Sequence, residues 1–236
     1  MKAIAGCIIC MVILFAAGCV KHKASVPPPL TNTVRAIVDG DSWTYSISGT
    51  SESISSGPVS GTIVETASED TTKSPGNVDV RAIDTKATLQ LGENQGPISL
   101  RDWIVQDKNG AIWRYGGRNG MSFWVEAPQS GCYCLMASPL GPTASWGSGL
   151  SLSTGFRGSF VLSVIGTDRV TVPAGTFDTY KVAGGAEDDW FLGAGAKTLT
   201  GWYAPQISNY VKKEYVGADT GPKIHVVLEL KDFSLN

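Results

Sequence analysis

The feature that most constrains this chain is the alternation of apolar and polar residues in short runs separated by closely spaced turn residues. In the stretch 43–48, Trp43, Tyr45 and Ile47 fall on one face of an extended strand, and small polar residues fall on the other. The stretch 224–231 repeats this pattern with aliphatic residues at every second position. Parallel crossovers would need about a dozen residues each, usually helical, and such runs are missing after residue 33. The pattern therefore predicts an antiparallel β domain.

Further strand-like runs fill most of the remaining sequence. They lie at roughly 78–91, 98–106, 111–116, 121–127, 131–137, 156–171, 176–184, 197–204 and 209–217. Turn residues separate most of them, as in Pro-Ala-Gly at 173–175. The stretch 138–155 is rich in Gly, Ser and Pro, and it predicts a long mobile loop that exposes Trp146. The expected fold class is all-β and mainly antiparallel, with about 10–12 strands and little helix apart from a signal segment.

The N-terminus has the organisation of an export signal. Lys2 precedes an uncharged stretch, 3–17, that ends in small residues before Cys19. The stretch is shorter than the roughly 20 apolar residues of a spanning helix. The sequence Ala-Ala-Gly-Cys at 16–19 resembles the lipobox of bacterial lipoproteins, which implies a signal peptide at 1–18 and acyl chains on Cys19. An ordinary secretory signal or an uncleaved anchor are the alternatives.

The segment 19–33 then predicts a lipidated tether rather than part of a core. Three consecutive prolines at 27–29 favour an extended polyproline II conformation, and their neighbours are small or polar. The β domain is expected at 34–236. Val20 follows the cysteine, and the sorting habits of the lipoprotein class place such a protein at the periplasmic face of the outer membrane, as a partner of the membrane.

Charge and cysteine usage exclude some functions. The formal net charge of −2 becomes −3 when Lys2 is removed, and the charges are scattered, so nucleic acid is not an expected partner. Two of the five cysteines leave with the signal, and Cys132 and Cys134 remain in the folded part. They are a candidate disulfide in an oxidising compartment, or reduced thiols side by side on one strand face. No cofactor and no metal are expected.

Four phrases together resemble a known family. They are GDSWTYSI at 40–47, DKNGAIWRYG at 107–116, VTVPAGTFDTYKV at 170–182 and GWYAPQISNYVKKEY at 201–215. They resemble uncharacterised bacterial envelope lipoproteins whose domains look like the lipoprotein carriers LolA and LolB. The resemblance implies a sheet curled into a half-barrel with an apolar concave face, and it transfers no catalytic residue. At 206–209 this chain lacks the glycines that the family tends to have, and Asn209 could adopt the left-handed conformation instead.

Catalysis finds little support in the sequence. His225 is the one histidine after the tether, and its strand position predicts a solvent-facing residue. No nucleophile elbow is present. The acidic groups Glu187-Asp188-Asp189 and Asp39-Gly40-Asp41 lack the ligand spacing of a calcium loop, so solvated turn carboxylates are expected. We therefore expect no enzymatic activity.

The seven tryptophans are the most suggestive candidates for binding. Most should lie in the core, because one aromatic side chain buries about 150–250 Å². A curled sheet also leaves a concave face, and aromatic rings on it would accept an acyl chain. The candidate residues for an apolar groove are Trp113, Tyr115, Trp124 and Trp202, and Trp202 and Tyr203 should fall on opposite faces.

Three hypotheses follow. The first is a lipid-anchored, non-enzymatic envelope protein that binds an apolar ligand or the lipidated end of another protein. The second is an assembly partner that offers a sheet edge or the 138–155 loop to another envelope protein. The third, a hydrolase or redox enzyme, has the least support.

Overall fold

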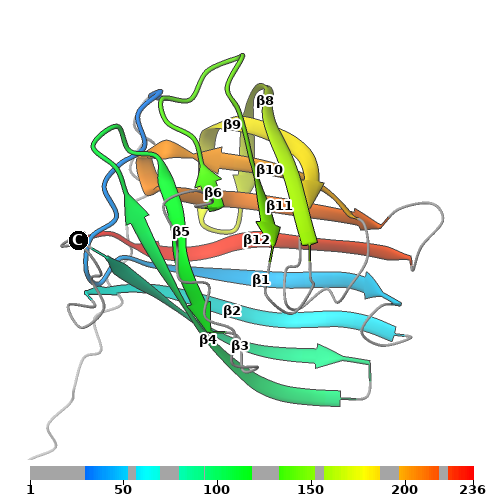
Figure 1. The fold of residues 1–236 in the computed structure, drawn as a ribbon. Helices are drawn as coiled ribbons and strands as arrows, with labels where there is room; N and C mark the ends of the chain where they lie inside the picture. Colours follow the sequence, from blue (N-terminus) through cyan, green and yellow to red (C-terminus); the bar gives the residue numbers. More distant parts are fainter. Residues whose placement is uncertain are drawn as a thin grey trace, which may run out of the picture.

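The computed structural model describes residues 30–52, 57–69, 80–92, 94–118, 133–151, 157–186, 197–217 and 223–236. They form one 12-stranded antiparallel sheet that curls into a nearly closed barrel (Figure 1). The strands are β1 (Ser42–Ser51), β2 (Gly57–Glu69), β3 (Arg81–Leu91), β4 (Asn94–Gln106), β5 (Ile112–Arg118), β6 (Tyr133–Met136), β7 (Ser145–Ser151), β8 (Arg157–Val172), β9 (Gly175–Ala186), β10 (Lys197–Ala204), β11 (Asn209–Gly217) and β12 (Ile224–Ser234). The predicted fold class is confirmed.

The sheet consists of two meanders joined at the ends of the chain. Its strand order is β6-β5-β4-β3-β2-β1-β12-β11-β10-β9-β8-β7, so β1 pairs with β12 and each meander runs outward from that pair. The two outermost strands, β6 and β7, lie side by side. The Trp146 indole Nε1 on β7 donates to the Leu135 carbonyl on β6 at 3.2 Å. This contact brings the curl close to a full barrel.

The prediction of a loop at 138–155 was wrong for residues 145–151 and for the exposure of Trp146. Residues 145–151 form β7 instead of a loop, and Trp146 is buried instead of exposed. Glycine and serine dominate this strand, and their weak strand preference hid it. Pairing with β8, which places Trp146 opposite the buried Leu162, outweighs that preference.

The turn at 173–175 has the conformation that its residues predict, whereas the turn after β10 differs from the prediction at one residue. Pro173 and Ala174 form the turn between β8 and β9, and Gly175 has the positive φ of 135° expected there. Between β10 and β11, a short 3-10 helix, η2 (Pro205–Ile207), makes the connection. Ser208, with φ of 55°, adopts the left-handed conformation that the sequence suggested for Asn209.

A segment that precedes β1, residues 30–41, lies against one end of the barrel, and we call it the strap. Val34 and Ile37 of the strap are buried in the main core. The Gln106 side chain on β4 fixes it, because its Oε1 accepts from the Ile37 amide at 2.9 Å and its Nε2 donates to the Arg35 carbonyl at 3.0 Å. The barrel is therefore covered at this end by its own N-terminal segment.

The strap is also joined to the C-terminus, through three residues that we call the clasp: Arg35, Asp41 and Asn236. The Arg35 guanidinium donates to both carboxylate oxygens of Asp41, at 2.6 and 3.1 Å, and to the Asn236 carbonyl at 2.8 Å. Asp41 is fully buried, so the expectation of a solvated turn carboxylate was wrong for this residue. Burial on its own would raise the pKa of this carboxyl, but hydrogen bonds from Arg35 and two backbone amides outweigh it and hold the pKa below its ordinary value.

Candidate binding site

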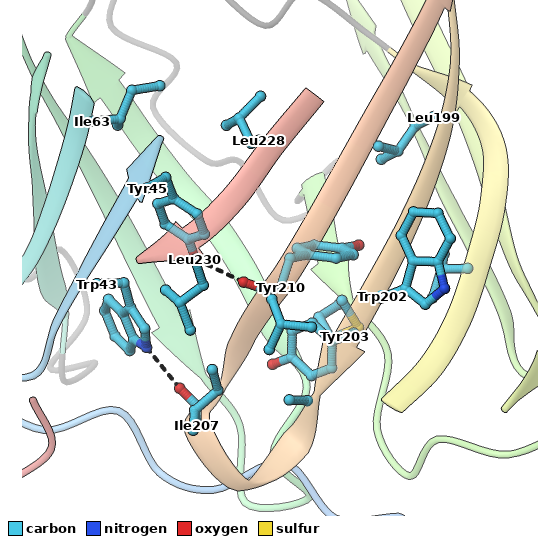
Figure 2. Packing of buried hydrophobic residues seen from close by; sticks show 14 of the residues in the cluster. Trp43, Tyr45, Ile63, Leu199, Trp202, Tyr203, Ile207, Tyr210, Leu228 and Leu230 are labelled. Atoms are coloured by element: carbon cyan, nitrogen blue, oxygen red, sulfur yellow. Dashed lines mark hydrogen bonds between the residues drawn. The ribbon is translucent and has the colours of Figure 1, made fainter. Parts of the chain in front are cut away.

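The interior near the strap is closely filled by aromatic and aliphatic side chains (Figure 2). Trp43 donates from its Nε1 to the Ile207 carbonyl at 2.9 Å, and the Tyr45 hydroxyl donates to the Tyr210 carbonyl at 2.9 Å. Tyr203 packs edge-on against the Tyr210 ring, with centroids 5.1 Å apart. The Trp43 indole nitrogen and the Tyr45 hydroxyl are thus paired within the core, which fits a structural role for this part of the interior.

Farther from the strap, one row of inward-facing residues crosses the sheet. Cross-strand pairing places one residue of each strand in this row, along the sheet order β4-β3-β2-β1-β12-β11-β10-β9-β8. In that order the residues are Gly96, Leu89, Gly61, Ile47, Leu228, Lys213, Gly201, Val182 and Val164. We call it the Lys213 row. Its members share the face of Tyr45 and Leu230, which lie in the next row toward the strap. The row therefore belongs to the interior of the barrel.

Glycine leaves this row without side chains at three positions, with different results. At Gly201, an added Cβ would stand 2.5 Å from the Tyr210 ring, so that ring already occupies the place. At Gly96 on β4, nothing lies within 4 Å of where a Cβ would stand. The row is therefore filled on the β10 side and open on the β4 side.

Apolar residues beside Gly96 are also incompletely covered. Ile98 and Leu100 on β4, and Ile83 on β3, lie on the inner face but remain partly exposed. By contrast, Ile63 on β2 and Leu228 on β12 are buried on that face. Within the described residues, the pairing of β5 with β4 runs from Arg101 to Gln106. We call Gly96, Ile98, Leu100 and Ile83 the β4 wall.

Two adjacent lysines on β11 face opposite sides of the sheet. Lys212 lies outward, where its Nζ is 3.3 Å from the Glu229 carboxylate. Lys213 lies inward, with its Nζ 4.9 Å from the centroid of the Tyr210 ring. Among the residues that the structure describes, no carboxylate forms an ion pair with Lys213. Among the described side chains, the contact recorded for this inward ammonium group is therefore an aromatic ring.

The tryptophans proposed for a groove have different surroundings. Trp202 and Tyr203 face opposite sides, as predicted: Trp202 pairs with Lys181 and Lys212, and Tyr203 with buried tyrosines. The Trp202 ring lies 5.4 Å from Lys181 Nζ, and its indole Nε1 donates to Asp168 at 3.0 Å. It therefore lies on the outward face.

The other candidates lie on or near β5. Trp113 is partly buried and packs against the main core, opposite Cys134. The Tyr115 side chain and Trp124 lie outside the described residues, so their place in a groove stays a prediction. Sequence reasoning missed the β4 wall and Lys213. Alternation at 98–102 and the adjacent lysines at 212–213 could have indicated them, because neighbours on a strand must face opposite sides.

Cys134 on β6 is buried in the core. Burial raises the pKa of the Cys134 thiol to about 11, so the group is a weak nucleophile at neutral pH. Cys132 lies outside the described residues, as do Cys19 and the signal segment. The disulfide and the lipidation therefore stay predictions.

Groups that could support catalysis or bind a metal are sparse in the described ranges. His225 is exposed, as predicted, and its Nε2 lies 2.9 Å from the Glu214 carboxylate. In these ranges no three His, Cys, Asp or Glu side chains are grouped as metal ligands would be. Glu187, Asp188 and Asp189 lie outside them. No described helix is long and apolar enough to cross a membrane.

Comparisons with known proteins show only distant similarity. No protein-family model matches the chain, and no curated protein does. A Bacteroides fragilis NCTC 9343 protein, provisionally described as exported and of YmcC-like fold, has 14% identity and a TM-score of 0.41 over 86% of this chain and 99% of its own. A beta-barrel-like protein from Brucella abortus, a domain of unknown function, has 9% identity and a TM-score of 0.46 over 85% of this chain and 99% of its own.

A third solved structure is a Parabacteroides distasonis ATCC 8503 protein provisionally described as a lipoprotein. It has 12% identity and a TM-score of 0.35 over 88% of this chain and 100% of its own. At such identities and TM-scores, these similarities carry no argument about what this chain does.

Proposed function

We propose that this chain is a lipid-anchored bacterial envelope protein without enzymatic activity, whose barrel interior binds an apolar ligand. The observation that carries the proposal is the β4 wall, where Ile98 and Leu100 remain partly exposed on the inner face. Binding would remove this apolar surface from water, at roughly 25 cal/mol per Å². The export signal and the lipobox resemblance support the envelope location, and the resemblance to LolA and LolB supports an acyl chain as ligand.

The proposal is tested by identifying guests in the purified protein. A soluble form that begins at Ser25 contains every residue that the structure describes, and it lacks Cys19 and therefore acyl chains of its own. We expect native mass spectrometry and solvent extraction of this form, purified from a bacterial periplasm, to find a stoichiometric lipid. An empty protein of bare mass in every preparation would contradict ligand binding.

Two substitutions locate the guest on the β4 wall. Ile98→Glu places a charge on the inner face, and we expect it to abolish lipid co-purification. Its matched control is Ser99→Glu, because Ser99 lies on the same strand, is exposed and faces the other side. Gly96→Phe starts a large side chain at a position where an added Cβ has no atom within 4 Å, and it should also exclude the guest while the protein stays folded. Retention of lipid by both inner-face variants would place the ligand elsewhere.

A second candidate function is supported by the outer face of β8. Val161 and Ile165 are 62% and 58% exposed there. Because β6 and β7 lie against each other, this face is a more accessible contact surface than the sheet edge between those two strands. In this alternative the protein is an assembly partner for another envelope protein. Cross-linking in cells should then capture a stoichiometric partner that Val161→Asp loses and Val216→Asp, on β11, retains.

A further inference from the structure

Lys213 is placed where a head group of an interior ligand could meet it. It pairs with Leu228 on β12 and Gly201 on β10, and it occupies the same inner row as Gly96 of the β4 wall. The side chain is partly exposed although it faces the interior. A ligand on the β4 wall and the Lys213 ammonium therefore share one face of the curled sheet.

The electrostatic surroundings of Lys213 differ from those of its neighbour. Lys212 is balanced by Glu229 on the outward face, whereas Lys213 meets the face of the Tyr210 ring and no carboxylate of the described residues. Two inward-facing carboxylates, Glu65 and Asp102, lie nearer the strap. Glu65 is four positions from Gly61 along β2, about 13 Å, and accepts a hydrogen bond from the Asn209 side chain at 2.8 Å. Asp102 pairs with Ile83 of the β4 wall, lies six positions from Gly96 along β4, about 20 Å, and has an interaction partner of its own.

We propose that Lys213 binds the acidic head of the ligand, so that the ligand class is an acyl chain ending in a carboxylate or a phosphate. This inference rests on the proposed function, because it assumes an apolar ligand on the β4 wall. The Tyr210 ring holds the ammonium in place from one side, and the anion binds it from another. A neutral acyl compound would gain only the apolar contact.

The test compares ligands that differ only in their heads. Binding of hexadecanoic acid, hexadecyl phosphate, hexadecanol and phosphatidylglycerol is measured on the delipidated form that begins at Ser25. Inorganic phosphate is measured as a head without a chain. We expect the two single-chain acids to bind about 10- to 100-fold more tightly than the alcohol, as a charge-assisted hydrogen bond predicts. Binding of phosphatidylglycerol as tightly as hexadecanoic acid would identify a phospholipid source, and weaker binding a free fatty acid.

Substitutions show whether the preference for an acidic head depends on Lys213 or on another positive group. Lys213→Met keeps the length of the side chain and removes its charge, and we expect it to bind acid and alcohol equally. Lys213→Arg should keep the preference. Lys212→Met, on the outward face, is the matched control and should behave like the unaltered protein.

The outcomes distinguish this inference from the proposed function. Equal binding of acid and alcohol by the unaltered protein would overturn the role of Lys213 and leave an apolar site. A full acid preference in Lys213→Met would also overturn it. Failure of every acyl compound to bind would reject the proposed function, and the inference with it. Tight binding of inorganic phosphate alone would show an anion site that needs no acyl chain, against the ligand class proposed.

Discussion

The two halves of the barrel interior differ in how completely they are covered. On the side of β1 and β12, Trp43, Tyr45 and Leu230 are buried, and the clasp ties the N-terminal segment to the C-terminus. Along the β4 wall, Leu100 and Ile98 lie in the same rows as Trp43 and Tyr45 but remain partly exposed. The buried side chains around Trp43 stabilise the fold, since burial of apolar surface drives folding. The exposed apolar surface of the β4 wall contributes less to stability and can bind a ligand.

The comparison predicts unequal costs for the same substitution in the two halves. Leu230→Ala removes a fully buried side chain and should lower the free energy of unfolding by about 3 kcal/mol. Leu100→Ala, on the β4 wall, should lower it by only about 1 kcal/mol, because part of that side chain already meets water. Urea denaturation of both variants measures the difference. Equal losses would mean that the β4 wall is part of the stabilising core.

The clasp should contribute more than a surface ion pair of similar geometry. Asp41→Asn should lower the free energy of unfolding by about 2 kcal/mol. Breaking a fully buried ion pair lowers it by roughly 3–5 kcal/mol, and the loss is smaller here because Arg35 is partly exposed. The matched pair is Asp84 and Arg101, joined by contacts of 2.6 and 2.8 Å on the surface. Asp84→Asn should cost at most about 0.5 kcal/mol. A loss in Asp84→Asn as large as that in Asp41→Asn would show that burial of the clasp is unimportant.

The same clasp predicts a dependence on acid. The pKa of Asp41 is lower in the folded protein than its ordinary value of 3.8, so the unfolded chain takes up the proton first as the pH falls. The contribution of Asp41 is therefore complete above about pH 4 to 5 and is lost as the pH falls through the lowered pKa. The stability difference between the unaltered protein and Asp41→Asn should be constant at neutral pH and shrink in acid. A stability difference that grows as the pH falls would mean that folding raises the pKa of Asp41 instead of lowering it.

The sequence was sufficient for the parts of the fold in which one face of a strand is buried. Alternation at 43–48 and 224–231 placed Trp43 and Leu228 on the inner face correctly. It failed at β7, where small residues carry little propensity and pairing with β8 decides. It also failed for Asp41, because an acidic turn looks solvated until the partners at Arg35 and Asn236 are known.

The candidate site was harder to predict for a related reason. Alternation separates the two faces of a strand, but it does not say which residues of the inner face other side chains will cover. Ile98 and Ile63 look equivalent in sequence, yet Ile63 is buried and Ile98 is partly exposed. The positive charge of Lys213 is visible in the sequence, but which of the described side chains surround it depends on pairing between residues far apart in the chain.

The smallest predicted effect concerns a polar atom inside the filled half. The Tyr203 hydroxyl is buried and has no hydrogen-bond partner among the described residues, whereas the Tyr45 hydroxyl donates to the Tyr210 carbonyl. Tyr203→Phe should leave the free energy of unfolding unchanged or raise it by up to about 1 kcal/mol, because it removes an unsatisfied group. Tyr45→Phe should lower it by about 1 kcal/mol through its lost hydrogen bond. Thermal and urea unfolding of the two variants give the comparison. A loss in Tyr203→Phe as large as that in Tyr45→Phe would mean that the Tyr203 hydroxyl bonds to a buried water or guest, and the filled half would then also take part in binding.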